Sequence, residues 1–216
     1  NLRDWRPPRW GVVAAVLLAL IAGLALAYDD NWIKALIERR VAAVTGRHFE
    51  IGGNFDVSLG RPGLGLDASG VALGNASWSK NPVMARARSV HVDINPWPLL
   101  RGRLDVTRIA LDKPELLLER NARGEANWRF DRKRPKRSSP TIRALSIRDG
   151  TLRVREPALH TDLRLAVETE REDAKDGYAR IVARGTGRYR NEPFELHGRL
   201  DSPLQLLRRG EGYRLD

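Results

Sequence analysis

The chain contains no cysteine, and this absence excludes several kinds of site. Without thiols it can form no disulfide, no cysteine-ligated zinc site and no thiol nucleophile. Aromatic residues are also scarce, at 6% of 216 residues, so a core built on large rings is not expected. The 19 glycines and 12 prolines instead indicate many turns, as in a protein of short β-strands.

Motifs of catalysis and of metal binding are missing as well. The four histidines, His48, His91, His160 and His197, lie far apart and form no HExxH or EF-hand spacing. The glycine-rich stretch 60–70 lacks the Gly-Lys-Ser/Thr end of a phosphate loop and is typical of a bent strand. No G-x-S-x-G elbow is present. We therefore expect no enzyme activity and no metal or other cofactor.

The formal net charge of +11 raises the question of nucleic-acid binding. Most arginines, however, are spread along the chain at alternating positions, as on solvated strand faces. The one dense run, RKRPKR at 132–137, has no aromatic residues interleaved with it. We predict polar strand faces, near anionic lipid, and no nucleic-acid partner.

Residues 11–28 form an uncharged apolar run of 18 residues. As a helix this run is about 27 Å long, close to the hydrocarbon thickness of about 30 Å. Arginines precede it and Asp29 and Asp30 follow it, which predicts a cytoplasmic N-terminus (1–10) and an exported remainder.

A cleaved signal peptide is the alternative for this run. Ala25-Leu26-Ala27 has the form that a signal peptidase accepts. Apolar signal cores are usually only about 7–15 residues long, so the pattern favours a retained transmembrane helix. Both hypotheses place the bulk of the chain outside the cytoplasm.

A short amphipathic helix is predicted next, within residues 29–46. Apolar residues recur at helical spacing from Ile33 to Val44, Asp30 can cap the start, and Gly46 can cap the end. The helix can pack on one end of a sheet or lie at the membrane surface.

Strand patterns dominate the rest, in two β sections (47–130 and 141–216) joined by a basic loop (131–140). Alternation predicts strands at 57–60, 64–73, 89–94, 102–111, 114–120, 141–147, 151–156, 159–167, 178–189 and 194–200. Turn signals separate most of them, among them DKP at 112–114 and DG at 149–150. RIAL at 108–111 breaks the alternation of the preceding RLDV by one step, as a bulge does. The arrangement expected is a meander, and the chain is expected to be a piece of a longer protein.

One face of this sheet needs an apolar cover. In LHTDLRLAV (159–167) leucines and a valine alternate with charged residues, so one face is apolar and the other is wet. A closed barrel or a sandwich could supply the cover. One face of 178–189, however, reads Ala, Ile, Ala, Gly, Gly, Tyr, which has little bulk to fill a core. We expect another apolar substance to occupy the face.

Several ordered motifs resemble the AsmA family. They are an N-terminal apolar segment, a helix ending in TGR (45–47), EIGG (50–53), NPWPLLRG (95–102), DKPELLL (112–118) and GEANWRF (124–130). ALSIRDGTLRVRE (144–156) also resembles the strand–DG–strand hairpin of that family.

The resemblance implies a mainly β, α+β fold: an open groove of antiparallel, twisted sheet behind a transmembrane helix and a short helix. It implies a single-pass protein of the bacterial inner membrane that faces the periplasm. There it would hold or conduct phospholipid acyl chains and support outer-membrane biogenesis. The alternative function is non-enzymatic assembly of outer-membrane proteins through contacts with other envelope proteins at exposed strand edges.

Candidate groove residues are the apolar positions of the alternating strands. They are Val90, Val92, Ile94, Leu104, Val106, Leu116, Leu118, Leu152, Val154, Leu159, Leu163, Leu165, Val167, Ile181, Phe194 and Leu196. Trp128 and Phe130 are predicted to share a strand face. They either plug the end of the sheet or line a groove mouth, where a lipid head group would meet Arg132 to Arg137.

Overall fold

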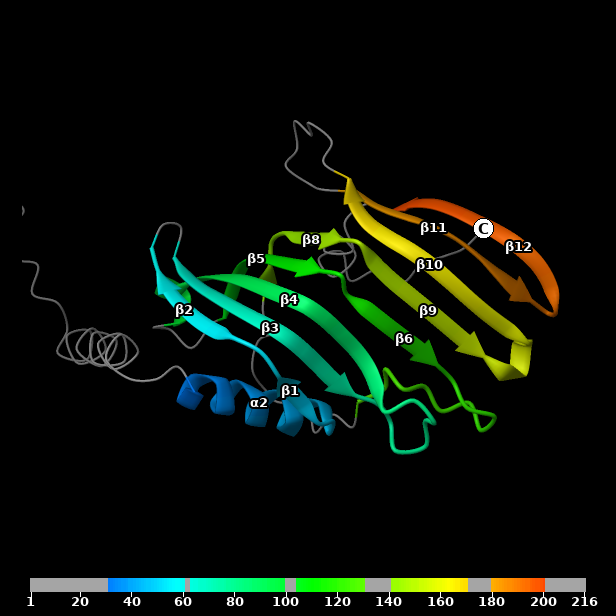
Figure 1. Cartoon of the computed structure of the whole chain (residues 1–216), viewed down its shortest axis with the longest axis horizontal. Helices are drawn as coiled ribbons and strands as arrows, with labels where there is room; N and C mark the ends of the chain where they lie inside the picture. Colours follow the sequence, from blue (N-terminus) through cyan, green and yellow to red (C-terminus); the bar gives the residue numbers. More distant parts are fainter. Residues whose placement is uncertain (1–30, 61–62, 100–103, 131–140, 171–179, 201–216) are drawn as a thin grey trace, which may run out of the picture.

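The chain folds into one curved β-sheet with few helices (Figure 1). A computed structural model describes residues 31–60, 63–99, 104–130, 141–170 and 180–200. The predicted transmembrane helix (11–28), the possible cleavage site at Ala27 and the basic loop (131–140) lie outside the described residues. None of the helices within those ranges is long and apolar enough to cross a membrane.

The elements follow one another as the alternating and helical patterns indicate, with a few additions. The helices are α2 (Asn31–Thr45), α3 (Pro96–Leu99) and the 3-10 helix η1 (Pro157–Leu159). The strands are β1 (Phe49–Ile51), β2 (Phe55–Leu59), β3 (Leu64–Gly74), β4 (Val83–Asn95), β5 (Asp105–Asp112), β6 (Glu115–Glu119), β7 (Thr141–Ile142), β8 (Leu145–Arg148), β9 (Gly150–Glu156), β10 (Thr161–Glu170), β11 (Arg180–Tyr189) and β12 (Glu192–Leu200).

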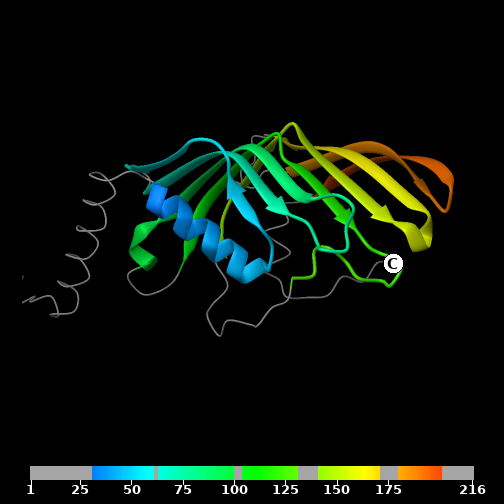
Figure 2. The same cartoon turned by 60° about the horizontal axis from the view of Figure 1, so that its bottom comes forward.

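The sheet is open, as predicted. Its main path runs β1-β3-β4-β6-β9-β10-β11-β12, with β2 beside β3 and with β5 beside β4, β7 and β8. The two ends of this path, β1 and β12, do not pair with each other. The described residues therefore form neither a closed barrel nor a sandwich, and Figure 2 shows the sheet as an arch.

The prediction of a purely antiparallel meander is wrong, because the sheet is mixed. β8 runs parallel to β5, and β9 runs parallel to β6. β7, which follows β6 in the chain, lies beside the first residues of β5, so β8 and β9 run in the same direction as β5 and β6.

Two predicted turns are kinks within continuous strand lines. β5 and β6 both pair with β4, so the DKP segment joins two parts of one line. β8 and β9 form a second continuous line beside β5 and β6, so DG at 149–150 does not form the expected hairpin. A two-residue type I′ turn needs positive φ at both central residues. Here Asp149 has φ 51°, whereas Gly150 is not in the left-handed region, so the chain bends without reversing.

The bulge predicted between RLDV and RIAL is present. Asp93 pairs with Arg108 and Ile94 with Val106, so Thr107 is the extra residue on β5. Its hydroxyl donates a hydrogen bond to the carbonyl oxygen of Asp93 at 3.1 Å. Because of this extra residue, Val106 and Ile109 both face the same side of the sheet.

Helix α2 covers the first edge of the sheet. Gly46, at φ 66°, ends the helix, and its N–H donates to the carbonyl oxygen of Ala42 at 2.8 Å. The Glu38 carboxylate accepts a hydrogen bond from the backbone N–H of Ile51 in β1 at 2.9 Å, and Ile51 is buried. Figure 2 shows α2 under the arch. The predicted packing of this helix on one end of the sheet is therefore observed.

Candidate functional site

An apolar row crosses the whole sheet from its first strand to its last. Each member is paired with the next across neighbouring strands of the main path. The row is Phe49, Leu73, Ala85, Leu116, Leu152, Leu165, Gly185 and Leu196. Eight strands at about 4.8 Å spacing give the row a length of about 34 Å.

This row belongs to the side of the arch that carries α2, here called the inner face. Phe49 and Ile51 lie on the same side of β1, and Ile51 is buried beside α2. On β10 the burial alternates along the strand, with Leu163, Leu165 and Val167 turned inward. The alternation predicted for LHTDLRLAV is therefore present from Thr161 onward.

A hollow of about 390 Å³ opens on the inner face. It spans both sides of the kink in the strands, and its lining is almost entirely apolar. The apolar lining residues are Val71, Leu73, Ala85, Ala87, Val90, Leu111, Pro114, Leu116, Ile147, Gly150, Leu152 and Val167. Most of these are only half-buried. The described residues thus form one layer whose apolar face is incompletely covered.

Fourteen of the predicted groove residues lie in strands. They are Val90, Val92 and Ile94 (β4), Val106 (β5), Leu116 and Leu118 (β6), Leu152 and Val154 (β9), Leu163, Leu165 and Val167 (β10), Ile181 (β11), and Phe194 and Leu196 (β12). The pairings of neighbouring strands bring them to the inner face. Whether they contact lipid stays a prediction.

Two predicted groove residues lie outside the strands. Leu159 belongs to η1 and is 43% exposed, because the strand it was assigned to begins only at Thr161. Leu104 precedes β5 and is 42% exposed. Neither lies on the apolar row.

Sequence reasoning missed several residues of the hollow. Ala85 and Ala87 were not identified, because β4 begins at Val83, six residues before its predicted start. Leu73 was not identified although it lies in the strand predicted at 64–73. Leu111 and Ile147 were not identified either. The bulge at Thr107 puts Leu111 in the opposite phase to Val106, and the kink at Asp149 puts Ile147 in the opposite phase to Leu152. Counting the alternation afresh after the bulge at Thr107, and separately before and after DG, would have found both.

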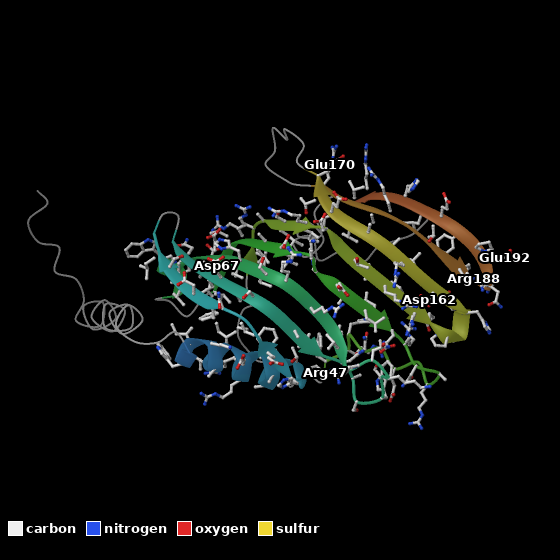
Figure 3. All side chains as sticks on the ribbon, in the orientation of Figure 1. Arg47, Asp67, Asp162, Glu170, Arg188 and Glu192 are labelled. Carbon is white, nitrogen blue, oxygen red and sulfur yellow. The ribbon has the colours of Figure 1, made fainter. Side chains whose placement is uncertain are left out.

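The other side of the sheet, the outer face, is polar and carries paired charges. The Arg153 guanidinium donates two hydrogen bonds to the Asp162 carboxylate at 3.0 and 2.7 Å, and Arg155 lies 3.6 Å from it. The hydrogen bonds from Arg153 lower the pKa of Asp162. Figure 3 shows Asp162 near Arg188, the residue that lies opposite it in the register of β10 and β11. These charged residues of β9, β10 and β11 thus lie on the face opposite the row from Phe49 to Leu196.

A second outer cluster joins β3 to β4. His91 lies between two carboxylates, with Nδ1 2.7 Å from Asp67 and Nε2 3.1 Å from Asp93. The hydrogen bond to Asp67 raises the pKa of His91. With both ring nitrogens already paired, this cluster is not a metal site. No group of three or more acidic, histidine or cysteine side chains in the described residues could hold a metal ion.

The NWRF segment differs from its prediction. Residues 127–130 are a turn and irregular chain, so Trp128 and Phe130 do not share a strand face. Trp128 is 37% exposed, with the Arg120 guanidinium 5.7 Å from the ring centroid. The residue of this segment that packs inside the protein is Asn127, which is fully buried at the end of β6.

Asn127 holds the end of β6 through its side chain. Its Oδ1 accepts a hydrogen bond from the Glu119 N–H at 3.0 Å, and its Nδ2 donates to Leu117 O at 2.8 Å and Asn75 Oδ1 at 3.0 Å. Asn75 and Ser79 in turn donate to the buried Glu119 carboxylate. This network joins the loops that follow β3 and β6, and it serves the fold.

Comparison with known proteins agrees with the motifs. No curated protein and no solved structure matches the chain. The sequence model of the AsmA family matches residues 10–166, well over half of the chain. The chain therefore belongs to the AsmA family.

Proposed function

We propose that this protein holds or conducts phospholipid acyl chains along the inner face of its sheet. The observation that carries the proposal is the unbroken apolar row from Phe49 to Leu196. At about 34 Å it is roughly twice the depth of one bilayer leaflet, whose hydrocarbon is about 15 Å thick. Full exposure of such a face to water would be costly, since each buried Leu, Ile or Val stabilises a protein by about 1.5–3 kcal/mol.

The separation of the two faces supports the same function. Acyl chains have no groups to hydrogen-bond, and the hollow offers an almost entirely apolar lining. The charged residues of β10 lie on the outer face, where Asp162 pairs with Arg153 of β9. No catalytic step is required of such a groove, and we propose a non-enzymatic role.

Family membership and the sequence support a proposed place of action. The family resemblance implies an inner-membrane anchor and a periplasmic body, and residues 11–28 have the length and composition of such an anchor. We place this protein in that compartment, supporting transport of phospholipid to the outer membrane.

The test is mass spectrometry of the lipids that copurify with the full chain in detergent. Leu163→Asp puts a carboxylate on the inner face, and Ala166→Asp puts the same group on the exposed outer face of the same strand. Phospholipid carried by the wild type and by Ala166→Asp, but lost from Leu163→Asp, supports the groove. Circular dichroism checks that both variants keep the sheet. A wild-type chain that carries no lipid contradicts the proposal.

One observation favours a second function, assembly through protein contacts. β12 is nine residues long and pairs only with β11 among the described strands, so its outer edge can accept another strand. Crosslinking at β12 to a specific envelope protein, with lipid content unaffected by Leu163→Asp, would favour this function.

A further inference from the structure

Exposed apolar side chains gather at the end of the molecule where α2 begins. β2 ends at Leu59, which is 60% exposed, and α3 presents Trp97, which is 72% exposed. Trp32 and Leu36, in the first two turns of α2, are each 44% exposed. Figures 1 and 2 agree that the start of α2 lies at the same end of the arch as the tip of β2.

Contacts between the turns hold this end together. Leu59, Leu64 and Ile94 form one cross-strand row, which places the end of β2 beside the end of β4. A Cβ atom at Gly63 would lie 2.5 Å from the carbonyl oxygen of Ile94 and 3.2 Å from Pro96 Cδ. The turn after β2 and the start of α3 are therefore in close contact.

α3 restricts the backbone on both sides of its tryptophan. Pro96 and Pro98 flank Trp97, and the Trp97 N–H donates a hydrogen bond to Asn95 Oδ1 at 3.3 Å. The prolines fix φ on both sides of Trp97, so the backbone there has little conformational entropy left to lose on binding. An exposed indole is thus carried on a restricted stretch of backbone.

Exposed aromatic residues at the other end of the strands have polar partners. Trp128 lies under Arg120 at 5.7 Å and Tyr189 under Arg190 at 5.8 Å. No such cation lies over Trp32 or Trp97 among the described residues. The end formed by Trp32, Leu36, Leu59 and Trp97, here called the apolar rim, therefore lacks a covering group within the described part of the chain.

Chain connectivity identifies the surface that the apolar rim meets. Asn31 follows Tyr28 by three residues, which span at most about 10 Å when fully extended. If residues 11–28 cross the membrane, the first turn of α2 must lie within that distance of the bilayer. Tryptophan favours the boundary between head groups and hydrocarbon, because its ring is apolar and its N–H is polar.

We propose that the apolar rim contacts the membrane that anchors the chain. It would lie in the periplasmic leaflet, at the boundary between head groups and hydrocarbon. Trp32 and Leu36 form one side of this contact, and Leu59 and Trp97 form the other. The contact would hold the first end of the inner face at the bilayer surface, where lipid can pass between the membrane and the groove. The inference rests on the proposed function in two respects: residues 11–28 anchor the chain in the membrane, and the inner face carries lipid.

The absence of cysteine makes a direct test possible. Single-cysteine variants Leu59→Cys and Trp97→Cys carry a nitroxide spin label in the full chain, reconstituted into phosphatidylethanolamine–phosphatidylglycerol vesicles. Leu159→Cys is the matched control, since it is 43% exposed and belongs to η1 beside the first residues of β10. Oxygen partitions into lipid and a nickel chelate into water, so their collision rates report the surroundings of each label.

Labels at 59 and 97 should collide more often with oxygen than with the nickel chelate, while the label at 159 should show the reverse order. Equal water exposure at all three positions would overturn the apolar rim as a membrane contact, as would failure of the chain to sediment with the vesicles. The amount of lipid that copurifies with the chain tests the groove separately. A lipid-free chain with membrane-facing labels at 59 and 97 would refute the groove and keep the rim.

Discussion

Leu165 of β10 lies directly opposite Gly185 of β11, and the two backbones approach so closely there that no side chain fits on β11. A Cβ atom at position 185 would come within 1.9 Å of the Arg164 carbonyl oxygen and 2.8 Å of Leu165 Cα. The small residue on β11 thus lets the sheet curve where the apolar row passes from β10 to β12.

Gly185→Ala should therefore destabilise the sheet. Backbone atoms have to move to admit the methyl group, and overpacking of this kind costs about 1–3 kcal/mol. The measurement is urea unfolding of the detergent-solubilised chain. The control is Gly198→Ala on β12, where the nearest atom to an added Cβ is Leu196 Cδ2 at 3.8 Å. Equal effects of the two substitutions would refute the close approach.

Asn127→Ala should also destabilise the fold. It leaves the Glu119 N–H without the Asn127 acceptor and Leu117 O without its donor, at a cost of about 1–3 kcal/mol for each buried group left unpaired. The neighbouring Trp128→Ala should cost less than about 1 kcal/mol, because it removes an exposed ring and one cation–π contact. Thermal unfolding of both variants compares them, and a larger loss for Trp128→Ala would restore the predicted plug.

The alternation of β10 could be predicted because it is local. Leucine and valine recur every second residue from Leu163 to Val167, and a strand with one apolar face shows this pattern whatever its neighbours are. The helix at Asn31–Thr45 was predictable for the same reason. The path of the strands was not, because parallel pairing of β8 and β9 depends on a return of the chain that leaves no periodic signal.

Turn residues predicted one hairpin that is absent, and they did not predict another that is present. Asp149-Gly150 has the usual sequence of a two-residue hairpin but kinks a continuous line instead. The two-residue hairpin between β11 and β12 is made by Arg190 and Asn191, with φ 53° and 69°. Tertiary pairing decides between these outcomes, since a left-handed residue can end a strand or only bend it.

The pair of carboxylates around His91 should make stability depend on pH. Hydrogen bonding to Asp67 raises the folded-state pKa of His91 above its ordinary value of about 6.5. The stabilisation is therefore fully present below that value and is lost as the pH rises through the folded-state pKa.

His91→Gln should consequently reduce stability at about pH 5.5 more than at about pH 8.5. Urea unfolding of wild type and variant at the two pH values measures the difference. His197→Gln is the control, because no carboxylate of the described residues forms an ion pair with His197. An effect of His91→Gln that is the same at both pH values would contradict the raised pKa.

The kink at Asp149 gives the last prediction, because its backbone lies in the left-handed region, which Asp tolerates and a β-branched residue does not. Asp149 has φ 51°, and a β-branched side chain there adds strain of about 1–3 kcal/mol. Asp149→Val should therefore lower the free energy of unfolding by about that amount. Asp149→Gly should change it by less than about 1 kcal/mol, since relief of strain is offset by the greater entropy of the unfolded chain.

Arg148→Val is the matched control, one residue earlier, exposed and within β8, where a β-branched residue fits the extended backbone. If Asp149→Val were as well tolerated as Arg148→Val, position 149 would not need a left-handed residue, and the bend could not be assigned to it. A large loss at 149 alone would locate the bend there. The same kink lets Ile147 and Leu152 both line the hollow, although residues five positions apart on a regular strand face opposite sides. The experiment therefore also tests how β8 and β9 come to share one apolar face.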